Sequence, residues 1–167
     1  NHDCPTIGGL KTLILLFADD SLLISKTQSG LQNLIDSFVD FCAQKGLELN
    51  SSKTKCMTFQ GQRLRQFSFK DGSTFLDSVT KIDYLGIRIQ NKLIWNDQLE
   101  KSVLTIKQRS GAIKRLHHST KSRAVTPALE VYKAQIQSGA LYGAELWGTS
   151  DCHRLVVVEN HFLKSLL

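Results

Sequence analysis

The chain has 167 residues, 41% of them hydrophobic, and its 21 Lys and Arg residues against 15 Asp and Glu give a formal net charge of +6. A chain of this length and composition can bury a core of ordinary size, which argues against intrinsic disorder. The longest apolar run, Leu13–Ala18, is far shorter than the roughly 20 residues that span a bilayer, so we expect a soluble, intracellular protein.

The positive charge is concentrated in the middle of the chain. Residues 1–80 hold eight Lys/Arg and eight Asp/Glu, residues 81–123 hold ten against three, and residues 124–167 hold three against four. Such a basic stretch suits a nucleic-acid phosphate backbone, whose contacts supply affinity without sequence specificity. A solvated helix face has the same composition, so charge alone leaves both interpretations open.

A β-hairpin is predicted near the N-terminus. Two short apolar strands, 10–17 and 22–25, are separated by the polar Asp19-Asp20-Ser21. Two carboxylates at a hairpin tip can present negative charge to a metal ion. Because neighbouring strand residues point to opposite faces, we expect Asp19 to face the metal directly. An ordinary turn has the same composition and stays open as the alternative.

An amphipathic helix and several strands are predicted next. Apolar residues recur at helical spacing from 28 to 45, with Thr27 or Ser29 as possible N-caps and Gly46 as the stop. A turn is predicted at Lys70-Asp71-Gly72. The strand-like segments are 47–50, 56–59, 66–69 and 81–90. The first part of the chain is therefore expected to mix helix and strand.

Beyond Trp95 the pattern becomes helical. Asn96 can cap a first helix, and Thr126-Pro127 is a start signal for a second, because proline at the first helical position sacrifices no hydrogen bond. A third helix is predicted to begin near Ser150 or Asp151. The apolar residues of the first helix are spaced to share one face: Leu99, Val103, Ile106, Ile113 and Leu116.

Four motifs in this order resemble those of the reverse transcriptases of non-LTR (LINE-like) retrotransposons. Phe17-Ala18-Asp19-Asp20 resembles the family's [Tyr/Phe]-Ala-Asp-Asp box. Residues 46–55, Gly-Leu-Glu-Leu-Asn-Ser-Ser-Lys-Thr-Lys, resemble its Gly-Leu-x-x-Asn-x-x-Lys-Thr-Lys segment. Tyr84-Leu85-Gly86 is similar to its primer-grip turn, and Ala140–Gly143 with Trp147-Gly148 is similar to the pattern after its thumb helices. The resemblance covers nearly the whole chain.

The resemblance implies an α+β fold and a polymerase function. Residues 1–92 would form the C-terminal part of a polymerase palm, a hairpin plus a helix and short antiparallel strands. Residues 93–167 would form an all-helical thumb or connection region. The implied activity is that of an RNA-directed DNA polymerase, a nucleotidyltransferase that uses Mg²⁺ or Mn²⁺, an RNA template, a DNA primer and deoxynucleoside triphosphates. It would work in the nucleus and cytoplasm, with no membrane involved.

The resemblance also implies residue roles. Asp19 and Asp20 would be catalytic and bind the metal. Lys53 or Lys55 would reach the departing pyrophosphate, although a solvated loop lysine is an equally open interpretation. Tyr84 would contact the primer sugar or fill the core. The full primer- and template-binding set would be Tyr84, Leu85, Gly86, Lys101, Lys107, Arg109, Lys114 and Arg115, with Lys121 and Arg123 beyond it.

One departure from the family pattern limits the expected activity. Two-metal polymerases need carboxylates from two separate strands, and in this family the other aspartate lies well upstream of the Ala-Asp-Asp box. Only 18 residues precede Asp19, and Asp3, the one acid among them, shows no matching pattern. We therefore expect half of a two-metal site that is inactive without a missing N-terminal half. The alternative is a non-catalytic retroelement remnant that binds nucleic acid.

Overall fold

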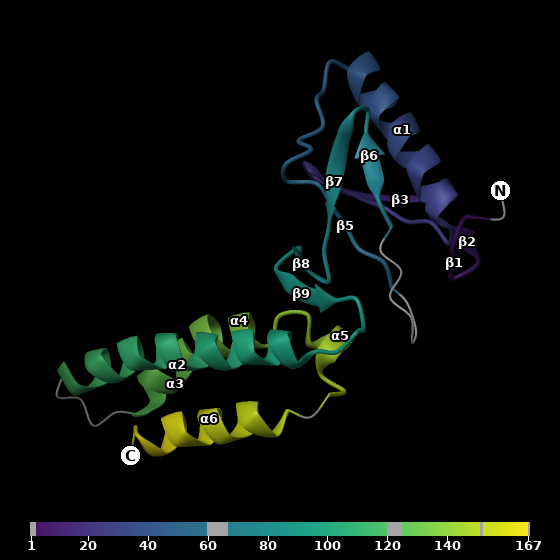
Figure 1. The fold of residues 1–167 in the computed structure, drawn as a ribbon. Helices are drawn as coiled ribbons and strands as arrows, with labels where there is room; N and C mark the ends of the chain where they lie inside the picture. Colours follow the sequence, from purple (N-terminus) through teal and green to yellow (C-terminus); the bar gives the residue numbers. More distant parts are fainter. Residues whose placement is uncertain (1–2, 60–66, 120–124, 151, 167) are drawn as a thin grey trace. The chain divides into compact units, whose positions relative to one another are not determined.

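The computed structural model describes residues 3–59, 67–119, 125–150 and 152–166, and the chain forms two compact units. The N-terminal unit, residues 1–80, combines short strands with one helix, and the C-terminal unit, residues 81–167, is a set of helices with one hairpin (Figure 1). Each unit has its own hydrophobic cluster. The α+β composition expected from the sequence is confirmed, while the palm and thumb assignments stay predictions.

Two hairpins open the N-terminal unit. Strand β1 (Thr6–Ile7) pairs antiparallel with β2 (Leu10–Lys11), and β3 (Ile14–Phe17) pairs antiparallel with β4 (Asp20–Leu23). The prediction of one continuous strand over 10–17 is therefore wrong, because its two ends belong to different hairpins. The predicted hairpin around the two aspartates is confirmed.

Helix α1 (Gln28–Gln44) has the bounds that the sequence predicts to within one residue. Thr27 is the N-cap, and its Oγ1 accepts a hydrogen bond from the Gly30 backbone N–H at 3.0 Å. Just past the helix, Gly46 takes a φ of 69°, a left-handed conformation that ends helices at little steric cost.

A three-stranded sheet completes the N-terminal unit. Its order is β5-β7-β6, in which β7 (Thr74–Ser78) lies between β5 (Lys55–Cys56), which is parallel to it, and β6 (Phe69–Asp71), which is antiparallel. Helix α1 packs against β6. The buried residues that join helix and sheet are Ile35, Cys56, Phe69 and Leu76.

Several strand predictions in this unit are wrong in detail. Residues 47–50 form no strand, and the segment predicted at 56–59 contributes only Cys56 to a strand. The turn predicted at Lys70-Asp71-Gly72 lies at Gly72-Ser73, since Asp71 pairs with Thr74. The central strand β7 was not predicted, and residue 66 lies outside the described residues.

The C-terminal unit begins with a hairpin. Strands β8 (Lys81–Tyr84) and β9 (Ile87–Gln90) pair antiparallel, so the prediction of one strand over 81–90 is wrong. Both loop residues, Leu85 and Gly86, have positive φ (47° and 82°), as in the type I′ turns that suit two-residue hairpins. The hairpin packs against α2, which explains why it belongs to the compact unit that begins at residue 81. The palm–thumb boundary predicted near residue 92 stays a prediction.

The helices of this unit surround one core. The central helix α2 packs against four of the helical segments that follow it, α3, η1, α4 and α6 (Figure 1). Trp147 and Ile136 are fully buried, and the Tyr132 ring stacks on Phe162 with centroids 4.9 Å apart. The elements are α2 (Asn96–Ser119), α3 (Val125–Tyr132), a π-helix η1 (Lys133–Gln137), α4 (Ser138–Ala140), α5 (Ala144–Trp147) and α6 (His153–Lys164).

The three helix starts predicted from the sequence agree with these bounds. Helix α2 begins at Asn96, and α3 begins one residue before Thr126-Pro127. Helix α6 begins at His153, shortly after Ser150. The predicted apolar face of α2 is confirmed for its described members, Leu99, Val103, Ile106 and Ile113, which are all buried.

Gly143→Ala is predicted to destabilise the protein. Gly143 has a φ of 69°, and a Cβ at this position would meet the Ile87 side chain, so we expect a loss of about 1–3 kcal/mol in the free energy of unfolding. Gly111→Ala is the matched control, because Gly111 lies within α2 with open space around its Cα. That change should stabilise by up to about 1 kcal/mol. Urea denaturation measures both, and equal effects would contradict the structure.

Candidate functional site

The two aspartates lie at the tip of the β3–β4 hairpin. Phe17 pairs with Asp20, which leaves Ala18 and Asp19 as a two-residue loop. Asp19 is therefore a loop residue and Asp20 is the first residue of β4, whereas the sequence predicted both in the turn. The face that Asp19 presents is thus set by the loop and not by strand alternation. Both aspartates are exposed.

Ala18 has an unusual backbone conformation. Its φ is 52°, in the left-handed region that costs an L-residue with a Cβ about 1–2 kcal/mol. Such strained residues persist where the surrounding structure holds them, and they cluster at functional sites. The conformation of Ala18 sets the direction of the chain into Asp19.

The donor chemistry of the hairpin tip fits a magnesium or manganese ion in part. Mg²⁺ prefers carboxylate oxygens and is commonly held by one or two carboxylates together with substrate phosphates and water. Asp19 and Asp20 supply such oxygens next to each other. Across the described residues, no group of three or more His, Cys, Asp or Glu side chains lies together. Asp19 and Asp20 are thus the candidate ligands that the hairpin tip offers, and their role in metal binding stays a prediction.

The strand that leads to the aspartates is apolar yet exposed. Its sheet has two strands, β3 and β4, in the described part of the chain. The side chains of β3 are between 38% and 66% exposed: Ile14, Leu15, Leu16 and Phe17. A two-stranded hairpin is marginally stable in water by itself, and a flat apolar edge is a template for pairing with a further strand.

Of the two candidate lysines for pyrophosphate contact, one is engaged within its own unit. The Lys55 ammonium lies 2.6 Å from the Asp77 carboxylate and donates to the Ser52 carbonyl at 2.9 Å. Strand pairing explains this contact, because Lys55 and Asp77 are register partners in β5 and β7. The Lys53 side chain is exposed and makes no hydrogen bond or ion pair with any described residue. Lys53 is thus the freer of the two cations.

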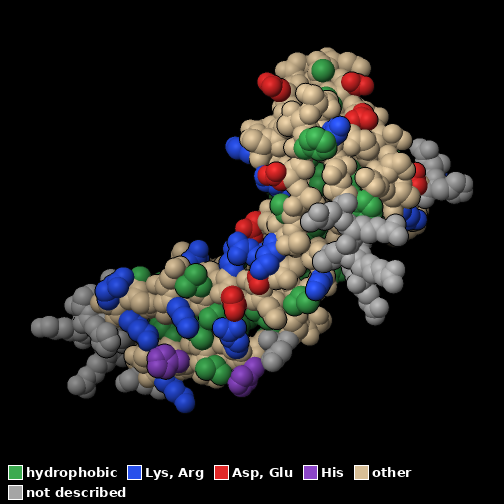
Figure 2. All heavy atoms as spheres, in the orientation of Figure 1, with side chains coloured by type: hydrophobic (Ala, Val, Ile, Leu, Met, Phe, Trp, Pro, Cys, Tyr) green, Lys and Arg blue, Asp and Glu red, His purple; other side chains and the backbone are tan. Residues whose placement is uncertain are grey.

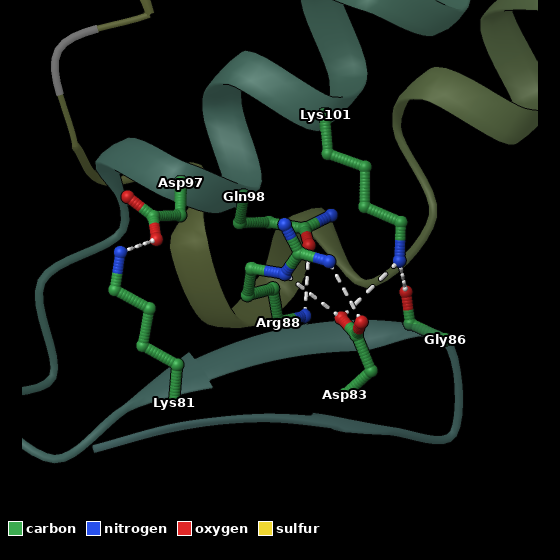
Figure 3. Close-up of polar contacts among 7 residues, drawn as sticks. All are labelled: Lys81, Asp83, Gly86, Arg88, Asp97, Gln98 and Lys101. Atoms are coloured by element: carbon green, nitrogen blue, oxygen red, sulfur yellow. Dashed lines mark hydrogen bonds and ion pairs between the residues drawn. The ribbon is translucent and has the colours of Figure 1, made fainter. Parts of the chain in front are cut away.

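Two residues of the C-terminal unit support the turn of the β8–β9 hairpin. The Lys101 ammonium of α2 donates to the Gly86 carbonyl at 2.8 Å (Figure 3). The Tyr142 ring lies nearby, since a Cβ on Gly86 would be in van der Waals contact with its Cε1 at 3.4 Å. Tyr84 and Leu85 are half-buried, so the turn is packed within the C-terminal unit, and its role as a primer grip stays a prediction.

Charged side chains bind this hairpin to α2. Arg88 donates through Nε and Nη2 to the two carboxylate oxygens of Asp83 at 3.1 and 2.7 Å, and the Lys101 ammonium lies 3.5 Å from the same carboxylate. Hydrogen bonding from Arg88, together with the nearby Lys101 charge, lowers the pKa of Asp83. The buried Gln98 accepts from the Arg88 backbone N–H at 2.9 Å, and Lys81 pairs with Asp97 at 2.5 Å (Figure 3).

Some of the predicted template-binding cations of α2 contact other residues of the chain, and others have no such contact among the described residues. Arg109 donates to the Gln135 carbonyl at 2.5 Å, and the Lys114 ammonium lies 5.8 Å from the Phe162 ring centroid. Lys107 and Arg115 are exposed and have no ion pair or hydrogen bond with a described residue. Figure 2 shows Lys and Arg side chains spread over the C-terminal unit. Two further predicted cations, Lys121 and Arg123, lie outside the described residues.

Comparisons with known proteins point to one family. The model of the family "Reverse transcriptase (RNA-dependent DNA polymerase)" matches residues 3–89, which include the β3–β4 hairpin and all but the last residue of the β8–β9 hairpin. No solved structure matches this chain. None of the described helices is long and apolar enough to cross a membrane.

Three curated proteins are similar to this chain. The Pol polyprotein of the type-2 retrotransposable element R2DM from Drosophila melanogaster is 37% identical over 90 residues, 48% of this chain and 8% of that protein. A probable RNA-directed DNA polymerase from transposon BS of Drosophila melanogaster is 23% identical over 93% of this chain and 18% of its own length. A transposon-derived protein of Caenorhabditis elegans, F52C9.6, is 32% identical over 50% of this chain and 30% of its own length. The chain thus spans less than a third of each relative.

Asp83→Asn should reduce the acid sensitivity of the fold. Because the folded pKa of Asp83 is lowered below its unfolded value of about 3.9, its contribution to stability is full above that value and is lost as pH falls through the folded pKa. The side chains of Asp83 and Arg88 are 47% and 39% exposed, so we expect only about 0.2–1 kcal/mol. Urea denaturation of wild type and variant between pH 7 and pH 2 measures this contribution to the free energy of unfolding. Parallel pH profiles for wild type and variant would contradict the role of this carboxylate.

Proposed function

Because this chain belongs to the reverse transcriptase family and its relatives come from non-LTR retrotransposons, we propose that it forms part of an RNA-directed DNA polymerase. The observation that carries the proposal is the placement of Asp19 and Asp20 at the exposed tip of a tight hairpin. Its substrates would be an RNA template, a DNA primer and deoxynucleoside triphosphates. The enzyme would work in the nucleus and cytoplasm.

The two aspartates would hold a Mg²⁺ or Mn²⁺ ion. Such an ion activates the attacking hydroxyl and neutralises the phosphates of the incoming nucleotide. Asp19, in the loop itself, is the residue we expect to bind it directly, and Asp20 would add charge and support the turn. Lys53 is the stronger candidate for contacting the departing pyrophosphate, because the ammonium of Lys55 is already paired with Asp77.

The site would be completed by a segment outside this chain. Two-metal sites take carboxylates from more than one element, and the described residues offer no third ligand beside the hairpin tip. The exposed apolar strand β3 is consistent with this proposal, since it offers an edge and a face to further strands. We therefore propose that the chain is inactive alone and works when joined to an N-terminal half that carries the other aspartate.

The C-terminal unit would hold the template and primer. Lys107 and Arg115 are exposed cations on α2 that have no partner in the described structure, so they can form ion pairs with phosphates without breaking an existing contact. The Tyr84-Leu85-Gly86 turn, in which Tyr84 and Leu85 are half-buried and Gly86 is exposed, would meet the primer strand. Because phosphate contacts are largely independent of sequence, this surface would follow the duplex through its backbone.

A second candidate function is that of a non-catalytic remnant that binds nucleic acid. The observation in its favour is that the exposed cations of α2 need no other segment to bind phosphate, whereas the two aspartates need further ligands. Metal-dependent primer extension separates the two candidates, and salt-dependent binding tests the surface that they share.

Asp19→Ala is predicted to abolish primer extension. The protein to test is this chain joined to the upstream segment of its own locus, on an RNA template with Mg²⁺. Loss of a group that stabilises charge in the transition state costs at least about 100-fold in rate. Asp40→Ala is the matched control, since Asp40 is an exposed aspartate on α1 of the same unit with no partner among the described residues. If the joined protein binds template and extends nothing, the remnant function is the correct one.

Lys107→Ala should weaken the binding of an RNA–DNA duplex. It should also make this binding less dependent on the salt concentration. Each phosphate contact that is lost lowers the slope of log K against log salt by about 0.9. The measurement is fluorescence anisotropy of a labelled duplex at several salt concentrations. Lys133→Ala serves as the control, because Lys133 already pairs with Glu130 at 3.4 Å. Equal slopes for wild type and Lys107→Ala would exclude this lysine from the interface.

A further inference from the structure

Lys101 was predicted to contact template phosphate, but its surroundings suit a different task. It lies in the first turns of α2, and its ammonium points toward the loop of the β8–β9 hairpin (Figure 3). It donates to the Gly86 carbonyl at 2.8 Å and lies 3.5 Å from the Asp83 carboxylate. Lys101 thus contacts both the loop of the hairpin and its first strand.

The charge of Lys101 is already partly neutralised. Asp83 lies between two cations, with Arg88 in a two-oxygen contact on one side and Lys101 on the other. A phosphate that bound the Lys101 ammonium would compete with the carboxylate and with the Gly86 carbonyl. Lys107, about one and two-thirds turns further along the same helix, has no such competitor among the described residues. Lys107 is therefore the better phosphate ligand of the two.

Packing also supports the turn. The Tyr142 ring lies against Gly86, and Gly143 lies against the Ile87 side chain, with no room for a Cβ. The Tyr142 carbonyl accepts a hydrogen bond from Trp147 Nε1 at 3.1 Å, and Trp147 is fully buried in the helical core. The turn is thus held by the Lys101 ammonium and lies near the Tyr142 ring, whose backbone carbonyl is bonded to the buried Trp147.

We propose that Lys101 is a positioning residue for the Leu85-Gly86 turn and not a nucleic-acid ligand. Its ammonium fixes the Gly86 carbonyl, and through it the direction in which the loop backbone faces. This proposal rests on the proposed polymerase function, in which the turn meets the primer strand. The consequence for the reaction is that loss of Lys101 misplaces the primer end without weakening the phosphate contacts of α2.

The first test needs no polymerase activity. Lys101→Met keeps the apolar stem and removes the ammonium, and Lys107→Met is the matched control on the same helix. We expect Lys101→Met to speed amide hydrogen exchange at least tenfold in the 84–88 segment and to leave the salt slope of duplex binding unchanged. Lys107→Met should leave hydrogen exchange in this segment unchanged and should lower the salt slope by about 0.9. A lower slope for Lys101→Met with unchanged exchange would overturn the proposal.

The second test separates positioning from binding. In the joined polymerase, Lys101→Met should lower the extension rate at saturating nucleotide about tenfold, while the dissociation constant of the primer–template duplex changes less than twofold. Lys101→Arg retains a donor and should recover most of the rate. A loss that appears only in the dissociation constant would overturn the proposal.

Two controls keep this test decisive. If Lys101→Met does not fold by circular dichroism, Asp83→Asn replaces it, because this change removes the carboxylate that steadies Lys101 and should give the same pattern more weakly. If the wild-type joined protein extends nothing, the proposed function fails and the role in primer placement fails with it. Hydrogen exchange in the chain alone then still decides whether Lys101 holds the turn.

Discussion

Strand register in two tight hairpins is the constraint on which both candidate elements depend. The pairs Phe17–Asp20 and Tyr84–Ile87 each leave two residues to reverse the chain, and a two-residue loop forces left-handed backbone. Ala18 in one loop and Leu85 in the other adopt it although they carry a Cβ. The cost of about 1–2 kcal/mol for each is met by packing elsewhere. The tight loops hold two groups at defined positions, the Asp19 carboxylate in one hairpin and the Gly86 carbonyl in the other.

The two hairpins obtain that support in different ways. The β8–β9 turn is clamped within its own unit, by the Lys101 ammonium and by the Tyr142 ring. The β3–β4 hairpin has no comparable cover in the described residues, and Phe17, next to its loop, is 62% exposed. The candidate metal-binding hairpin is therefore the less well covered of the two, which is consistent with the proposal that a segment outside this chain completes it.

Local signals in the sequence predicted local structure well. Thr27 and Gly46 marked the ends of α1, and the apolar spacing of α2 identified its buried face. The strand over 81–90 was wrong because leucine at position 85 gives no turn signal, so apolar alternation continued through the loop, and only the family resemblance predicted a turn there. Strand β7 and the contacts of Lys55 and Lys101 depend on pairing between distant segments, which no local pattern encodes.

The most direct measurement is the site at which Mn²⁺ binds in the joined polymerase with primer–template and an unreactive nucleotide analogue. Paramagnetic broadening of assigned amide resonances locates the ion. We expect selective broadening at residues 17–21, which is lost in Asp19→Ala and kept in Asp40→Ala. Broadening at the acids of α1, or none near the hairpin tip, would contradict the claim that this chain supplies a metal-binding carboxylate.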